Sequence, residues 1–200
     1  DLGLTQTEMA SAYGLATLAA ALCLPAMGWF LDRAGAKRML AVVALFFGSA
    51  CAAFGLVSGL FWLAIGFAAL RFLGQGSLML GSSNMVSQWF TRKRGTALGL
   101  MTMGFGISMA VHPELSQWLI EWVGWREAWF WIGATTWILV LPPIVILAIS
   151  KPEDVGLHPD GVIHSSTDED GAESVGPQMD FTLSEALHAP AFYIVAASLF

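Results

Sequence analysis

GWFLDRAGAKR, residues 28–38, places four charged side chains within seven residues, between two long apolar stretches. Residues 11–31 contain no charged side chain, and residues 39–90 contain only Arg71. A membrane-spanning helix needs about 20 mostly apolar residues. The quoted stretch therefore indicates a short polar loop between two membrane spans.

The composition favours an all-α integral membrane protein. The 200 residues are 56% hydrophobic and 12% charged, whereas soluble domains are about 25% charged. The net charge of −6 arises mostly in residues 151–180, and no basic patch indicates nucleic acid binding. Cys23 and Cys51 lie in apolar runs and suggest neither a disulfide framework nor a metal site. We therefore expect no catalytic residue, metal or cofactor.

The charge pattern predicts the membrane spans and their sidedness. The expected spans are residues 11–31, two helices within 39–90 that meet at a turn near 56–61, residues 96–118, residues 128–150, and the start of another near 189. Lysine and arginine divide seven to one between alternate loops, and they concentrate on the cytoplasmic side of membranes. Residues 33–38, 92–94 and 151–180 are thus expected inside, and residues 1–8 outside.

This sidedness predicts an odd number of further spans before the first residue, so we expect an interior piece of a longer protein. Residues 151–180 are rich in Gly, Ser, Asp and Glu, which is typical of a solvated linker. Thr182 and Glu185 have the spacing of a capping box. They predict either a short helix on the inner membrane surface or the first turn of the next span.

Two segments of the chain repeat one pattern. WFLDRAGAKR (29–38) and WLIEWVGWRE (118–127) share Trp, an acidic residue, Gly and a basic residue at an offset of 89 residues. Because three spans separate them, they lie on opposite membrane faces. Such an inverted repeat is typical of secondary transporters.

The residues quoted above resemble the major facilitator superfamily, whose signature G-x-x-x-D-R-x-G-x-K/R-R lies between its second and third spans. Every fixed position is matched here, by Gly28, Asp32, Arg33, Gly35, Lys37 and Arg38. Residues 71–76 resemble a second signature with the glycines displaced by one position. Residues 151–161 resemble the segment after the sixth span in the monocarboxylate and oxalate/formate branches. The resemblance implies a fragment covering spans two to six of twelve plus the start of span seven.

The resemblance also implies three segments and a conformational latch. Residues 1–150 would belong to the N-terminal six-helix bundle without its first span, residues 151–180 to a cytoplasmic acidic linker, and residues 181–200 to an interfacial helix and the start of the C-terminal bundle. Asp32 would face a helix N-terminus in the other half, while Gly28 and Gly35 allow close backbone approach. The alternative is a topology signal only, although basic residues alone would then suffice.

Arg71 and Gln75 are the candidate substrate-binding residues. Counting 1.5 Å per residue from Phe61 places Arg71 roughly 15 Å deep, near the midplane, where a charge is usually functional. Gln75 follows one turn later, and residues 78 and 82 continue the same face. The alternative is a structural pairing of Arg71 with an acid or with carbonyl groups. His112 and Glu114 are interpreted as residues near the outer surface.

These features predict a secondary active transporter, by symport or antiport, for a small organic anion such as a monocarboxylate or dicarboxylate. Its expected partners are that substrate, a coupling ion such as H⁺ or a counter-substrate, the lipid bilayer and the remaining C-terminal half of the same chain. We expect a multi-pass location in the cell membrane, which is the inner membrane in a bacterium. A carrier of another solute (a sugar, sugar phosphate or drug) and a transporter-like sensor remain alternatives, and an enzyme is not expected.

Overall fold

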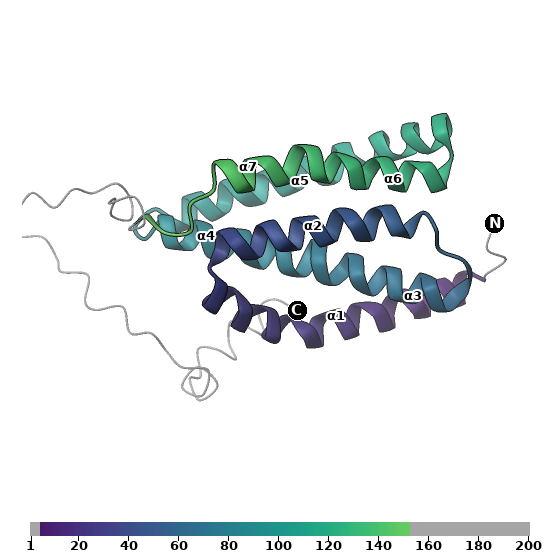
Figure 1. The fold of residues 1–200 in the computed structure, drawn as a ribbon, viewed down its shortest axis with the longest axis horizontal. Helices are drawn as coiled ribbons and strands as arrows, with labels where there is room; N and C mark the ends of the chain where they lie inside the picture. Colours follow the sequence, from purple (N-terminus) through teal and green to yellow (C-terminus); the bar gives the residue numbers. More distant parts are fainter. Residues whose placement is uncertain (1–4, 153–200) are drawn as a thin grey trace, which may run out of the picture. The chain divides into compact units, whose positions relative to one another are not determined.

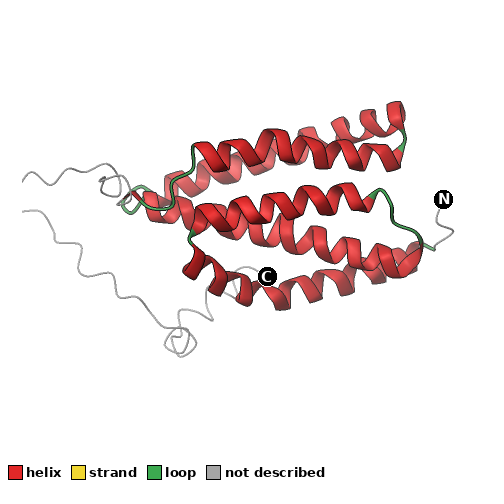
Figure 2. Cartoon of the chain, viewed as in Figure 1, coloured by secondary structure: helices red, strands yellow, loops and turns green. Residues whose placement is uncertain are grey.

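The computed structural model describes residues 5–152, which form five helical rods joined by short loops (Figures 1 and 2). The helices are α1 (Gln6–Ala34), α2 (Ala36–Phe54), α3 (Gly59–Leu70), η1 (Arg71–Leu78), α4 (Met79–Trp89), α5 (Arg94–Val123), α6 (Trp125–Thr135), η2 (Thr136–Val140) and α7 (Leu141–Ile146). The third rod joins α3, η1 and α4, and the fifth joins α6, η2 and α7. The predicted all-α fold is confirmed.

Four of the described rods are long and apolar enough to cross a membrane, namely Gln6–Ala34, Ala36–Phe54, Gly59–Trp89 and Trp125–Ile146. They coincide with four of the spans expected from the charge pattern, and the turn expected near 56–61 is the loop between Phe54 and Gly59. The α5 rod is 30 residues long. It is not among the four, and its sequence includes Glu114 and Glu121.

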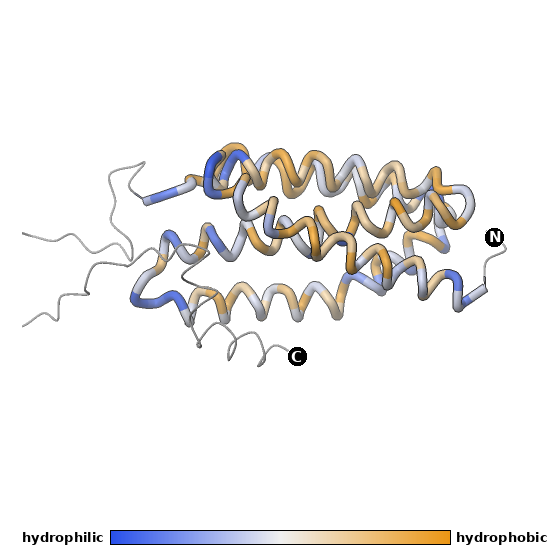
Figure 3. Tube along the Cα trace, turned by 90° about the horizontal axis from the view of Figure 1, so that it is seen from below, coloured by the Kyte–Doolittle hydropathy of each residue, from blue (hydrophilic) through white to orange (hydrophobic). Residues whose placement is uncertain are grey.

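The three loops expected inside the cell meet at one end of the bundle. The backbone N–H of Lys37 donates to Ser150 Oγ over 3.1 Å, and Trp89 Nε1 donates to the Ile149 carbonyl oxygen over 3.0 Å. Hydrophilic residues gather toward the ends of the rods, as Figure 3 shows, while the middle is mostly hydrophobic. This arrangement agrees with these loops sharing one side of the membrane, and their cytoplasmic location stays a prediction.

Sidedness can be tested by labelling single cysteines in the full-length protein after Cys23 and Cys51 are replaced. We expect an impermeant thiol reagent to label Ser58→Cys in intact cells, because the α2–α3 loop is predicted outside. Lys93→Cys should react only after the membrane is permeabilised. Rapid labelling of Lys93→Cys in intact cells would show that the predicted orientation is wrong.

The helix α2 lies at the centre of the described bundle and packs against α1, the third rod and the fifth rod. Its closest approach is to the fifth rod, where Gly133 lies against the Gly48 carbonyl oxygen and the backbone nitrogen of Ala52. Trp137 Nε1 donates to the Leu45 carbonyl oxygen over 3.1 Å. Small residues thus let two backbones meet, which is how helices commonly pack in membranes.

The predictions for residues 153–180 of the linker and for residues 181–200 lie outside the described residues. The proposed division at residues 150 and 180 therefore stays a prediction.

Candidate substrate site

The third rod changes from α-helical to π-helical geometry at Arg71 and returns to α-helix at Met79. Two glycines within this segment let neighbouring helices approach. A Cβ atom at Gly74 would lie 2.6 Å from the Phe47 ring on α2, and one at Gly76 would lie 2.6 Å from a Leu24 methyl group on α1. Segments with π geometry are frequent at functional sites. Here the segment holds the candidate residue Arg71 at the point where α1 and α2 both touch the rod.

Arg71 lies in this membrane-spanning rod without a carboxylate partner among the described residues. Its guanidinium carbon lies 4.5 Å from the centroid of the Tyr13 ring on α1. Its Nε is buried and has no hydrogen-bond partner within residues 5–152. An aromatic face attracts the cation without satisfying its N–H groups, so the guanidinium keeps donors available for an anion. The alternative of a structural ion pair finds no partner in the part of the chain that the structure describes.

A cavity of about 970 Å³ opens beside Arg71. Its walls come from α2, the third rod, α5 and the fifth rod, and most of the lining side chains are apolar, such as Phe47 and Phe105. Along α5 the wall extends from Met101 to Ile120, which is roughly 28 Å of helix. The volume lies within the range of small-molecule pockets, about 300–1,000 Å³.

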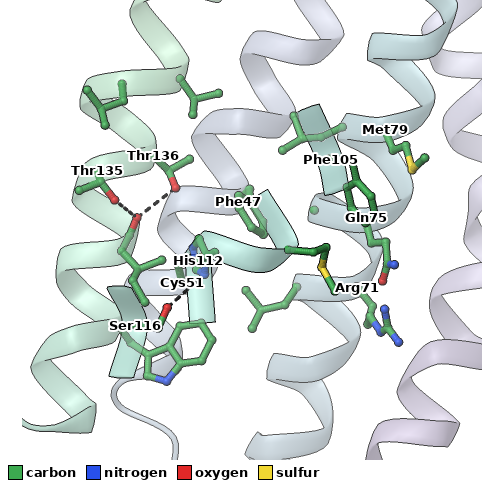
Figure 4. A pocket seen from close by; sticks show the side chains of 18 of the residues that line it. Phe47, Cys51, Arg71, Gln75, Met79, Phe105, His112, Ser116, Thr135 and Thr136 are labelled. Carbon is green, nitrogen blue, oxygen red and sulfur yellow. Dashed lines mark hydrogen bonds between the residues drawn. The ribbon is translucent and has the colours of Figure 1, made fainter. Parts of the chain in front are cut away.

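The face predicted on the third rod is present in the cavity wall. Arg71, Gln75, Leu78 and Ser82 all line the cavity. Figure 4 shows the side chains of Arg71 and Gln75 beside one another on η1. The sequence spacing therefore placed these four residues together correctly, whereas substrate binding by Arg71 and Gln75 stays a proposal.

Sequence reasoning missed a polar pair on another wall. His112 and Ser116 line the cavity from α5, and Ser116 Oγ lies 3.1 Å from His112 Nδ1 (Figure 4). His112 lies six residues before Trp118, roughly 9 Å along the helix. Trp118 stacks on Trp122, with ring centroids 5.8 Å apart. The i, i+4 spacing of His112 and Ser116 was the available signal, but the assignment near the outer surface obscured it.

Among the described residues, no group of three or more His, Cys, Asp or Glu side chains is placed so that it could hold a metal ion. A family model described as the Major Facilitator Superfamily matches residues 1–200. The chain belongs to the Major Facilitator Superfamily. This superfamily comprises membrane transporters rather than enzymes, so the protein is a multi-pass membrane protein and the expectation that it is not an enzyme is confirmed.

Several curated members of the superfamily are similar to this chain. A D-galactonate transporter of Escherichia coli is 30% identical over 162 residues, which cover 76% of this chain and 37% of that protein. A cis,cis-muconate transport protein of Acinetobacter baylyi is 32% identical over 107 residues, covering 52% and 25%. Monocarboxylate transporter 13 of Bos taurus is 33% identical over 69 residues, covering 34% and 16%. The matches span 25% to 37% of the first five relatives.

The superfamily signature forms the junction between α1 and α2. Gly35 alone joins the two helices, and its φ of 81° is a conformation that glycine adopts readily. Its neighbour across the junction is Ser150 Oγ, 3.4 Å from the position of a Cβ atom. Gly28 has no such neighbour within 4 Å among the described residues, so the expected close approach is not seen there. Gly35 is required by backbone conformation more than by packing.

The second copy of the pattern has the same geometry in this superfamily member. Gly124 joins α5 to α6 with φ 86° and ψ 158°, against 81° and 151° at Gly35. Each glycine ends a long helix that contains a proline. Arg126, which is equivalent to Lys37, donates from Nη1 to the Gly55 carbonyl oxygen over 3.0 Å. The backbone thus supports the inverted repeat that the sequence predicts.

Proposed function

We propose that the whole protein is a secondary active transporter that carries a small organic anion, a monocarboxylate or dicarboxylate, across the cell membrane by symport or antiport. The chain described here would supply part of its N-terminal bundle, and its nearest branch would be the monocarboxylate or oxalate/formate type. The observation that carries the proposal is Arg71, a cation within an apolar rod long enough to span a membrane. Its buried Nε has no hydrogen-bond partner among the described residues.

The cavity chemistry supports an anionic substrate. A buried charge is costly unless it is paired, and a guanidinium offers donors that match a carboxylate in two parallel hydrogen bonds. Gln75 on the same wall adds an amide donor. No carboxylate lines the cavity within residues 5–152, so an anion would meet one permanent cation and no like charge there. Relatives are named for galactonate, muconate and monocarboxylates, all of which are anions.

Uptake into proteoliposomes tests the proposal directly. The purified full-length protein would be reconstituted and assayed with labelled D-galactonate, cis,cis-muconate and lactate, and with galactose as a neutral control. We expect saturable uptake of at least one carboxylate and none of galactose. Binding without uptake would favour a sensor, and uptake of galactose alone would show that the anion assignment is wrong.

We also propose that the junction at residues 28–38 is a conformational latch on the cytoplasmic side. Asp32 lies exposed at the inner end of α1, and Arg33 lies over the Trp29 ring at 4.0 Å. Arg38 is also exposed, and the backbone of Lys37 is tied to Ser150. An exposed carboxylate at this end is available to a helix N-terminus in the rest of the protein, an interaction worth about 1 kcal/mol.

The variant Asp32→Asn tests the latch. Because it alters the balance between conformations and not the cavity, we expect uptake to slow about fivefold while the anion affinity changes less than threefold, in keeping with about 1 kcal/mol of lost interaction. Initial uptake rates and calorimetric affinity on the same preparation measure both quantities. Loss of equilibrium binding in a folded Asp32→Asn protein would refute the assignment.

A further inference from the structure

His112 is the histidine that lines the cavity among the described residues. The ionisable side chains among the described residues that line the cavity are Cys51, Arg71 and His112. A thiol with an ordinary pKa of about 8.5 and a guanidinium keep their charge states between pH 5 and 7. Histidine changes charge in that interval.

The contact with Ser116 suits both charge states of the imidazole. A hydroxyl group can donate and accept a hydrogen bond. When the ring is neutral with its proton on Nε2, Ser116 donates to Nδ1. When the ring is protonated, Nδ1–H donates to Ser116 Oγ, across the same 3.1 Å. Proton uptake therefore leaves this hydrogen bond in place and only reverses its direction.

The groups that face His112 favour an anion once the ring is charged. Arg71 and the neutral side chains of Gln75 and Ser82 line the cavity from the third rod. Cys51 lines it from α2. From the fifth rod it receives Thr135 and Thr136, whose hydroxyl groups donate to the Ile132 carbonyl oxygen of their own rod. Protonation of His112 on α5 would thus add a second positive charge to a cavity that already has Arg71 on its third-rod wall.

A second positive charge in this mostly apolar cavity would strengthen the attraction for an anion there. An anion should therefore raise the proton affinity of His112, and a proton on His112 should raise the anion affinity by the same factor, because such coupling is reciprocal. We propose that His112 is the proton-coupling residue of the cavity, taking up a proton from solution as an organic anion binds at Arg71. This inference rests on the proposed anion-transport function.

Calorimetric titration of the full-length protein with D-galactonate and cis,cis-muconate tests the coupling between pH 5.5 and 7.5. We expect wild-type affinity to be about tenfold higher at pH 5.5, which corresponds to a coupling of about one pKa unit. His112→Gln keeps a polar partner for Ser116 and should bind equally at both pH values, with the affinity of wild type at pH 7.5. Titrations in buffers of different ionisation enthalpy should show proton uptake in wild type and none in His112→Gln.

Control variants separate this proposal from the anion site. Cys51→Ser removes the other titratable wall residue and should keep the full pH response. A pH response that survives in folded His112→Gln would overturn the role of His112 and leave anion binding intact. The same conclusion would follow if wild type bound the anion equally at both pH values while Arg71→Ala lost binding. Absence of saturable binding and uptake of any carboxylate by wild type would instead overturn the proposed function, and the coupling with it.

Discussion

Replacing Arg71 by alanine is expected to weaken binding of the transported anion by about 30-fold to a few thousand-fold. Removing one partner from a buried charge-assisted contact costs on the order of 2–5 kcal/mol, and 1.4 kcal/mol corresponds to a tenfold change in affinity. The Nε of Arg71 is buried and unpartnered in the structure, so no described hydrogen bond from Nε is lost when the side chain is removed. Calorimetry on purified, monodisperse full-length protein measures the effect.

Two further variants make the Arg71 result specific. Arg71→Lys should recover little affinity, because a single ammonium group cannot reproduce the two parallel hydrogen bonds of a guanidinium. Arg126→Ala removes an arginine that contacts the Gly55 carbonyl and does not line the cavity, and it should bind the anion like wild type. Wild-type affinity in well-folded Arg71→Ala would remove Arg71 from the substrate site and leave the anion proposal without its main support.

Replacing Gly133 by valine is expected to destabilise the folded protein by about 3 kcal/mol, at the upper end for overpacked cores. A Cβ atom at this position would lie 2.5 Å from the Gly48 carbonyl oxygen and 2.9 Å from the backbone nitrogen of Ala52. Both are backbone atoms, so a rotamer change cannot relieve the overlap and α2 must move away from α6. The measurement is the midpoint of thermal unfolding in detergent, followed by size-exclusion chromatography.

Gly14→Val provides the matched control for Gly133→Val. Gly14 is also a helical glycine, but no described atom lies within 4 Å of its Cβ position. The control should lower the unfolding midpoint much less, because it introduces the same side chain without a backbone overlap. Equal midpoints for the two variants would show that the close approach of α2 and α6 does not limit stability.

The spans were predictable because each depends on a single strong signal. A long run with few charges indicates a membrane span, so the four apolar rods fall where the charge pattern places them, and α5 overlaps the span expected at residues 96–118. Arg71 could be found for the same reason, as a charge where charges are rare. The sequence predicted a short polar loop at residues 28–38, whereas in the structure Gly35 alone separates α1 from α2 and has a positive φ.

The remaining features depend on contacts that sequence spacing does not encode. The π geometry at Arg71 arises where Gly74 and Gly76 meet Phe47 and Leu24 on neighbouring helices. The expectation that His112 lies near the outer surface stays a prediction. That its ring lines the cavity depends on how α5 packs against the third and fifth rods, which sequence spacing does not encode.

The single-residue junctions at Gly35 and Gly124 have a mechanical consequence. Two helices joined by a single residue cannot slide along one another, because the connection is too short. Each pair should therefore move as a rigid unit. The third rod has no one-residue junction at its start, because a loop separates Phe54 from Gly59. It also contains eight residues of π-helix, which is wound more widely than α-helix. In the proposed transporter, bending should therefore be easiest at Arg71–Leu78, which is also the segment proposed to bind the charge of the substrate.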